Sequence, residues 1–418
     1  LKCCSYASSP STYLEGGSFC RPVADDCAAS VPDAAMGETW SEPAIGRVLL
    51  NNKAEWVVFF ASGYSNLKNS NVGRTIYALD AYTGEKLKDW TLKEEAPALG
   101  EGSAEIPTIN IENALTASPM LVDLSTEEDA GYGYVDRLYI GDLEGRVWKI
   151  VMDVTSRGNI DQWKRCVFFD AGDYDGDGLR NWAPIITRPQ VAMIETGQPN
   201  VFFGTGGDDR APNDVRYRFY AVQDEEPPGV CAAETDLSKA KNATDMRFGN
   251  TGNFEWVMGD GFKNSEWPLQ AVTNASEEGD SGDRYWSDPL IVDNELIYFA
   301  SLAGKIESVD PTVNIAGGDS KIYCVAIRNS SELNLKAGES CWTSGSVFER
   351  ESVKIRKAMM VQGIAQEAWA RDALPQGTDE ANIFYQRFSE SETPPPTLVH
   401  QGTGRAGLIK ILRWREVP

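Results

Sequence analysis

Short β-forming runs, each bounded by Gly, Asn, Asp or Pro, recur along this chain, whereas helical periodicity is scarce. Runs of this kind predict strands joined by tight turns, because β-branched and aromatic side chains favour strands and turn residues end them. We therefore expect an all-β fold. The clearest strands are expected at residues 56–61, 75–79, 137–141, 147–151, 200–204, 295–300 and 321–327.

Many of these strands share one arrangement, in which a strand ending in a small residue and Gly is followed by a turn and a second strand of the form aromatic-x-Leu/Ile/Val. Units of this kind lie at residues 59–84, 138–150, 202–222 and 298–310. Self-similar β units spaced by roughly 40 to 80 residues are typical of propeller blades. The repeat predicts a β-propeller of about six or seven irregular blades.

Proline marks the place where several of these units begin. An aromatic residue followed closely by Pro precedes units at 40–43, 182–184 and 286–289, and 117–119 is a weaker version without the aromatic. Proline is tolerated at the first position of a strand, where its missing N–H costs no ladder hydrogen bond. We expect each of these lead-ins to begin the inner strand of a blade.

Two stretches depart from the repeat. Residues 1–36 are rich in Cys, Ser and Pro, and are expected either to wrap the first blade or to end an upstream region. Residues 37–418 form the predicted propeller, with an insertion at about 350–395 that contains a helix-like segment at 352–372. The strand expected at 407–414 is a candidate to close the ring against the first blade, which would remove an exposed sheet edge.

Composition excludes several classes of function. The chain has 418 residues, 42% of them hydrophobic, and a net charge of -23 at pH 7. Such acidity repels phosphate backbones and anionic membrane surfaces, so no nucleic-acid binding is expected. No apolar run approaches the roughly 20 residues that a membrane-spanning helix needs. Because the chain begins with Leu1, we expect a processed or excised protein whose export signal has been removed.

The cysteines indicate disulfides and an oxidising compartment. The eight cysteines are Cys3, Cys4, Cys20, Cys27, Cys166, Cys231, Cys324 and Cys341. None belongs to a C-x-x-C pair, and with His400 as the single histidine a zinc site has few ligands to use. Candidate pairs are Cys166 with Cys231 and Cys324 with Cys341, and the first four would staple the amino-terminal lead.

An acidic loop, Asp173-Tyr-Asp175-Gly-Asp177-Gly-Leu-Arg-Asn181, has the spacing of a calcium loop. Calcium takes six to eight oxygen ligands, and side chains two residues apart in a tightly curled loop can point inward together. The predicted ligands are the side chains of Asp173, Asp175, Asp177 and Asn181 and the backbone carbonyl of Leu179.

The loop departs from the helix-flanked calcium motif at one position. Pro184 stands where the usual twelfth-position glutamate would be, so we expect a compact nine-residue loop whose shell is completed by water or a distant residue. The alternative is an acidic, glycine-rich turn that holds no metal.

Taken together and in order, these segments resemble the carboxy-terminal propeller region of the PilY family, large surface proteins of type IV pilus biogenesis and tip adhesion. The resemblance covers about residues 37–418, with 225–280 and 350–395 unmatched. The matching stretches are 39–48, 56–64, 76–84, 138–150, 184–189, 202–206, 219–222 and 414–416.

The resemblance implies a non-enzymatic protein at the bacterial cell surface, associated with the pilus. It implies pilus subunits or minor pilins as partners, with host or abiotic surfaces as further candidates. In such proteins a calcium loop on the propeller is implicated in controlling pilus extension and retraction, and the loop at 173–181 matches that kind of loop in spacing. The family's large amino-terminal half is absent from this chain.

The alternative hypothesis is a quinoprotein dehydrogenase, a class of enzyme that binds pyrroloquinoline quinone and Ca²⁺ on a propeller. Residues 78–90 resemble the tryptophan-docking strand of those enzymes, and Cys3 and Cys4 could form the vicinal disulfide that some carry. Those enzymes repeat the docking strand in nearly every blade, whereas this chain has one convincing copy. Hydrolytic catalysis is disfavoured, because no G-x-S-x-G elbow is present.

Overall fold

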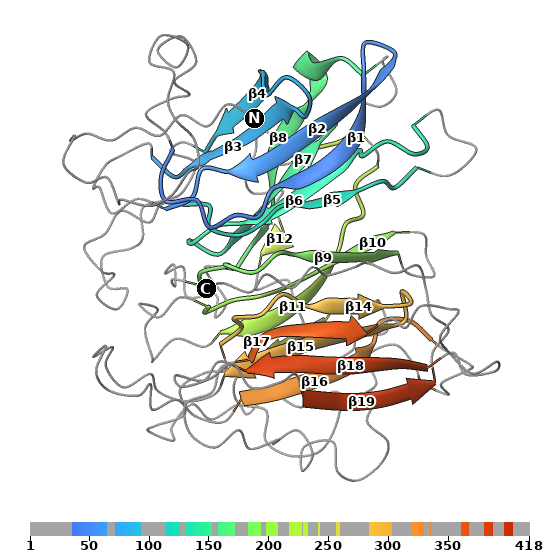
Figure 1. Ribbon diagram of the computed structural model, residues 1–418. Coiled ribbons are helices and arrows are strands. Elements are labelled where there is room, and N and C mark those ends of the chain that lie inside the picture. Colours follow the sequence, from blue (N-terminus) through green and yellow to red (C-terminus); the bar gives the residue numbers. More distant parts are fainter. Residues whose placement is uncertain are drawn as a thin grey trace, which may run out of the picture.

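The computed structural model shows a chain of β-sheets that follow one another in sequence order (Figure 1). The structure describes residues 36–64, 72–92, 114–125, 131–152, 158–171, 183–193, 198–207, 217–227, 229–232, 241–242, 256–259, 284–302, 320–329, 335, 361–367, 380–387 and 397–403. Within these residues the expected all-β class is confirmed, and helical structure is confined to short 3-10 turns such as η1 (Ile160–Gln162). No helix in this described part is long and apolar enough to cross a membrane.

Five sheets make up the described fold, and all their strands except β12 pair antiparallel in the order of the chain. Sheet 1 contains β1 (Ala44–Leu50), β2 (Lys53–Ala61), β3 (Thr75–Asp80) and β4 (Lys86–Thr91). Sheet 2 contains β5 (Met120–Val122), β6 (Arg137–Gly141), β7 (Arg146–Val151) and β8 (Lys164–Asp170), with β12 (Lys241–Asn242) added in parallel to β8.

The remaining sheets continue the series toward the lower part of Figure 1. Sheet 3 contains β9 (Gln190–Met193), β10 (Pro199–Gly204), β11 (Arg218–Gln223) and β13 (Trp256–Gly259). Sheet 4 contains β14 (Leu290–Val292), β15 (Leu296–Leu302) and β16 (Ser320–Ala326), and sheet 5 contains β17 (Val361–Glu367), β18 (Glu380–Arg387) and β19 (Thr397–Thr403). All seven strands predicted as clearest are therefore confirmed.

The sheets pack face to face, because the central strands are apolar on both sides. Leu138 and Ile140 of β6 join a core with Phe59 of sheet 1. Tyr139, which alternates with them, joins a second core with Phe203 of sheet 3. A third core lies between sheets 3 and 4. Successive side chains of a strand point to opposite faces, so a continuous apolar run predicts a strand buried on both.

The first strands of consecutive sheets contact one another, from β1 through β5, β9 and β14 to β17. β1, β5, β9 and β14 each start directly after a proline: Pro43, Pro119, Pro189 and Pro289. At three of the expected lead-ins, 40–43, 117–119 and 286–289, a strand thus begins directly after the proline as predicted. The one at 182–184 is wrong, because β9 starts after Pro189, while the carbonyl of Pro184 accepts a hydrogen bond from the Gly206 N–H at 2.8 Å.

The predicted helical insertion is also wrong where the structure describes it. β17 occupies 361–367, inside the helix expected at 352–372, and β18 occupies 380–387 in the same insertion. Antiparallel pairing of β17 with β18 along its length outweighs the local helix preference of its Ala, Gln and Glu residues. The lead at 1–35 and the strand expected at 407–414 lie outside the described residues.

Candidate functional site

The acidic loop is bounded by two buried alanines, one on each side. Ala171 follows β8 and Ala183 precedes the lead-in to β9, and both are almost completely buried. The predicted calcium ligands Asp173, Asp175, Asp177, Leu179 and Asn181 lie outside the described residues, so the calcium site stays a prediction. The structure does show the part of the fold to which both ends of the loop are attached, here called the frame.

The frame is the turn between β6 and β7. The Ala171 N–H donates to the Gly145 carbonyl at 2.9 Å, and the Ile185 N–H donates to the Asp142 carbonyl at 2.9 Å. One four-residue turn therefore holds the chain on both sides of the acidic loop. This fixes the distance that the loop must span.

Asp142 makes the turn rigid. Its Oδ1 accepts hydrogen bonds from the N–H groups of Glu144 and Arg146, both at 2.9 Å, and its Oδ2 accepts one from Trp148 Nε1 at 2.7 Å. Asp142 is fully buried, so these donors replace the water that its carboxylate would otherwise need. The Asp142 side chain thus links the frame to Trp148 in the core between sheets 1 and 2.

Gly145 lets the chain at Ala183 approach the turn closely. Its φ is +91°, and a Cβ at this position would lie 2.6 Å from the Ala183 carbonyl oxygen. Replacing Gly145 with Ala is expected to lower the free energy of unfolding by about 1–3 kcal/mol, since the left-handed backbone and the clash both penalise a side chain. Urea denaturation would measure this.

The matched control for this prediction is Gly229→Ala. Gly229 also has a positive φ, +77°, but a Cβ there would meet nothing within 4 Å. We expect a loss of about 1 kcal/mol from the backbone conformation alone. Equal losses for the two variants would contradict the close approach of Ala183 to the turn.

A β-bulge sets the direction of the chain as it enters the loop. Val147 pairs with Phe169 but the next residue, Trp148, pairs with Val167, so Phe168 is the extra residue in β8. Bulges bend a strand and re-aim the side chains that follow. Beyond the bulge, Arg146 Nε donates to Asp170 Oδ2 at 3.1 Å, which joins β7 to the last residue of β8.

Among the residues that the structure describes, no group of three or more His, Cys, Asp or Glu side chains is arranged to hold a metal ion. The frame itself therefore supplies no complete metal shell. The chemistry of the loop's own donor set, three carboxylates and an amide, is what fits calcium.

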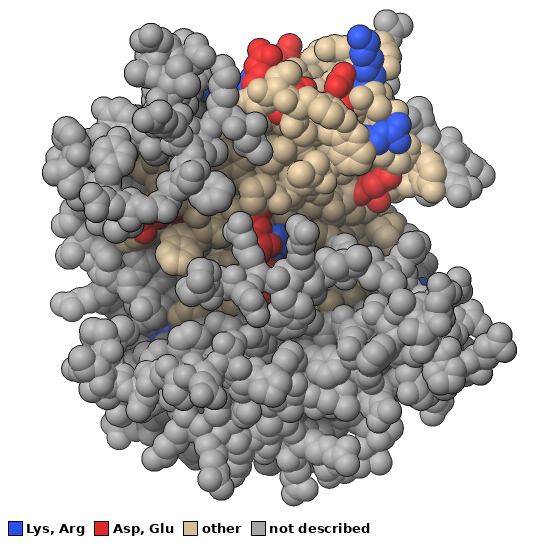
Figure 2. Space-filling view, in the orientation of Figure 1, with Lys and Arg blue, Asp and Glu red and all other residues tan. Residues whose placement is uncertain are grey.

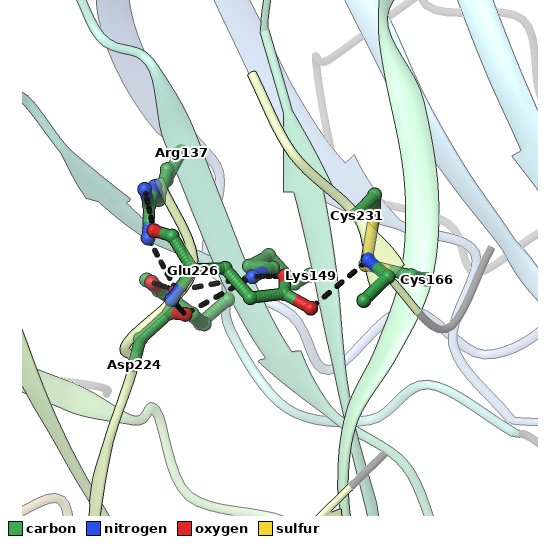
Figure 3. Close-up of a disulfide and its surroundings, with 8 residues drawn as sticks. Arg137, Lys149, Cys166, Asp224, Glu226 and Cys231 are labelled. Carbon is green, nitrogen blue, oxygen red and sulfur yellow. Dashed lines mark hydrogen bonds and ion pairs between the residues drawn. A yellow bond between two sulfur atoms is a disulfide. The ribbon is translucent and has the colours of Figure 1, made fainter. Parts of the chain in front are cut away.

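A second feature near the frame is a buried cluster of charges between sheets 2 and 3 (Figure 3). Asp224, which follows β11 and is 1% exposed, accepts hydrogen bonds from Arg137 Nη1 at 2.5 Å, Tyr139 Oη at 2.6 Å and Lys149 Nζ at 3.1 Å. The three donors lie on β6 and β7. Asp224 therefore fastens the chain leaving sheet 3 to the middle of sheet 2.

The segment that continues from Asp224 to Ala232, here called the strap, is fixed at several points. The backbone carbonyl of Glu226 accepts a hydrogen bond from Arg137 Nη2 at 2.7 Å. In the Glu226 side chain, Oε1 accepts a hydrogen bond from the Ala232 N–H at 2.9 Å and Oε2 forms an ion pair with Lys149. The Cys166–Cys231 disulfide, with a Cα–Cα distance of 5.8 Å, ties the strap to β8. Figure 3 shows the disulfide beside the ion pairs.

The neighbouring cations keep Asp224 ionised despite its burial. Burial acts to raise the pKa of Asp224, but Lys149 and Arg137 outweigh it and lower that pKa below its ordinary value. Burial also raises the pKa of Tyr139 well above its ordinary value, so its hydroxyl stays protonated and donates to Asp224. The cluster thus contains two cations that depend on the strap for their counter-charges.

The structure confirms the predicted Cys166–Cys231 pair. Cys324 is also disulfide-bonded, while its predicted partner Cys341 and the four amino-terminal cysteines lie outside the described residues. The charge cluster itself was not predicted. A lysine inside the apolar run 147–151 was the signal that a buried acidic partner existed, but its partner lies 75 residues away in sequence.

The strand that resembles a quinoprotein docking motif has a packing role. Asp80 Oδ1 accepts hydrogen bonds from the N–H groups of Tyr82 and Thr83, at 2.9 and 2.6 Å, and so forms the turn between β3 and β4. Trp90 at the end of β4 stacks on Trp163, with ring centroids 6.2 Å apart, in the core between sheets 1 and 2. The segment is an ordinary hairpin of sheet 1.

Comparison with known proteins finds relatives in type IV pilus biogenesis. The chain is 24% identical over 282 residues to the type IV pilus biogenesis factor PilY1 of Pseudomonas aeruginosa strain PAO1, and equally to that of strain PAK. Each match covers 59% of this chain and 22% of the relative, so the chain spans about a fifth of the length of these curated relatives.

Among solved structures, the crystal structure of the Pseudomonas aeruginosa PilY1 carboxy-terminal domain matches with a TM-score of 0.48 and 15% sequence identity, and covers 87% of this chain and 72% of that one. No family model matches the chain. The resemblance to the PilY family seen in the sequence is thus supported by the match to these curated relatives.

Proposed function

We propose, from its resemblance to the carboxy-terminal region of the PilY family, that this chain is the propeller part of a type IV pilus biogenesis or tip-adhesion protein. It acts without catalysis, at the bacterial cell surface, through contacts with pilus subunits or minor pilins. The observation that carries the proposal is the ordered match over 282 residues to a protein named for type IV pilus biogenesis.

The proposed propeller closes on the outer face of sheet 1. The inner face of this sheet packs on sheet 2, but the outer face carries Ile45 and Trp56, which are 62% and 44% exposed. Val58 lies on the same face, opposite Ile45 in the pairing of β1 with β2. Figure 2 shows the described surface in the region of sheet 1 as mainly uncharged, with scattered acidic and basic side chains.

An apolar sheet face of this kind is suited to packing against another sheet, as the facing sides of sheets 1 to 4 do. The candidate for covering it is the carboxy-terminal part of the chain, with the strand expected at 407–414. Closure would remove the free edges and apolar faces that an open series of sheets leaves in water.

Calcium is the proposed ion of the acidic loop. Bound Ca²⁺ would neutralise the repulsion between Asp173, Asp175 and Asp177, and the loop would then hold one conformation between its two fixed ends. Because Ala171 and Ile185 are hydrogen-bonded to one turn, ordering of the loop between them would act on the segment that leads to β9. Calcium occupancy would in this way tune how the propeller meets its partner.

The test is calorimetric titration of the purified chain with CaCl₂. Asp175→Ala is expected to lower the calcium affinity of this loop at least 10-fold, because one of three carboxylate ligands is lost. Asp161→Ala is the matched control, since Asp161 is an exposed aspartate in η1 and its loss should leave the titration unchanged. An identical titration for the unaltered chain and Asp175→Ala would contradict the calcium assignment.

A further inference from the structure

A second candidate for cation binding lies in the loop between β5 and β6. Asp136, immediately before β6, is 3% exposed. Its Oδ2 accepts a hydrogen bond from the Leu124 N–H at 3.3 Å, so the carboxylate faces the start of this loop. Its Oδ1 is buried and has no hydrogen-bond partner among the described residues.

Asp123 lies at the start of the same loop and joins its two ends. Asp123 Oδ1 accepts hydrogen bonds from the Ser125 N–H, at 3.0 Å, and from the Ser125 hydroxyl. Its Oδ2 accepts one from the Gly133 N–H at 2.7 Å. Residues 123–125 and 131–136 are therefore held together at the base of the loop, with Asp136 beside them.

Burial and the nearby Asp123 disfavour the ionised form of Asp136. Burial first, and the nearby Asp123 in addition, raise the pKa of Asp136 to about 6, while Arg137 acts in the opposite direction. Arg137 is already bonded to Asp224 and to the Glu226 carbonyl. A buried carboxylate with an unpaired oxygen costs free energy unless a proton or a cation neutralises it.

The sequence of the loop favours a cation over a proton. The stretch Asp123-Leu-Ser125-Thr-Glu127-Glu-Asp129 places an oxygen-bearing side chain at every second position. That alternation resembles the first, third, fifth and seventh positions of a calcium loop. Carboxylate and hydroxyl oxygens are hard donors, which suit Ca²⁺ rather than a transition metal.

We propose that the base of the β5–β6 loop binds a second Ca²⁺, with Asp136 Oδ1 and the Asp123 carboxylate as ligands. This site is separate from the acidic loop at 173–181 and does not depend on the pilus assignment. The cation takes the place that a hydrogen-bond donor would otherwise fill at Asp136, and it offsets the repulsion between the two aspartates.

The test uses TbCl₃ and CaCl₂ as probes on chains carrying Asp175→Ala, which removes the first site. Tyr132 and Tyr134 lie in the same loop and should sensitise terbium emission. We expect emission in the Asp175→Ala chain that Ca²⁺ displaces, and at least a 10-fold loss when Asp136→Asn is added. Adding Asp161→Asn instead should change nothing.

Two outcomes would overturn the proposal. The first is no terbium emission or calcium binding in the Asp175→Ala chain, which would mean that Asp136 holds a proton only. The second is binding that Asp136→Asn leaves unchanged. Thermal denaturation in EDTA checks folding, because Asp136→Asn removes a repelled charge and should be at least as stable as the unaltered chain without calcium.

The outcomes for the two sites are independent. If Asp175→Ala leaves all calcium binding intact and Asp136→Asn removes it, the acidic loop at 173–181 is not a calcium site and the second site stands. If the reverse holds, the first site stands and the second is excluded.

Discussion

Replacing Asp224 with Ala is expected to lower the free energy of unfolding by about 3–5 kcal/mol, because the substitution leaves two buried cations without their shared carboxylate. Lys149 and Arg137 are each about 1% exposed or less, and neither can reach water without opening the interface between sheets 2 and 3. Tyr139 also loses its acceptor. Chemical denaturation with urea would measure the loss from the shift in midpoint at constant slope.

Asp89→Ala is the matched control for Asp224→Ala. Asp89 pairs with Lys86 at 3.6 Å, but both side chains are partly exposed, so its loss should cost at most about 1 kcal/mol. Replacing Arg137, Lys149 and Asp224 together with apolar residues should cost less than Asp224→Ala alone, because no unpaired charge remains buried. A loss of under 1 kcal/mol for Asp224→Ala would show that the cluster is open to solvent.

Removing the Cys166–Cys231 disulfide is expected to cost about 2–4 kcal/mol, since the bridge closes a loop of 65 residues and restrains the unfolded chain. The variant is Cys166→Ser with Cys231→Ser, measured by urea denaturation under oxidising conditions. Val230→Ser is the control, because Val230 neighbours the bridge but is exposed and should cost less than about 0.5 kcal/mol.

The disulfide and Asp224 should act together, because both hold the strap against sheet 2. A chain lacking both is expected to lose less than the sum of the two separate losses, since a strap released by one change can no longer be restrained by the other contact. Additive losses would show that the two restraints act on different segments. An unchanged midpoint without the disulfide would contradict its role in fastening the strap.

Much of the fold could be predicted from local sequence. Strands such as 137–141 and 147–151 are apolar at most positions and bounded by turn residues, and the structure buries both of their faces. The segment 361–367 was wrongly predicted as a helix because its Ala, Gln and Glu residues favour a helix locally, while its pairing with β18 depends on residues about 20 positions away. Local residue preferences contain no information about such a partner strand.

The site was predicted less completely for the same reason. Every cysteine in a sequence is a visible candidate for a disulfide, so the Cys166–Cys231 pair could be proposed from composition and spacing. Asp224 could not be distinguished from the many other acidic residues, because its structural role depends on contacts with β6 and β7 that the sequence does not show. Asp142 likewise reads as a turn residue, and only the structure shows that its turn carries both ends of the acidic loop.

A crystal structure of the chain grown with CaCl₂ is the most direct test of the proposed PilY-like propeller with calcium in the loop at 173–181. We expect a calcium ion bound by Asp173, Asp175, Asp177 and Asn181 and by the carbonyl of Leu179, with a sheet from the carboxy-terminal part of the chain covering Ile45 and Trp56. An ordered loop without an ion at saturating calcium, in an open series of sheets, would contradict it.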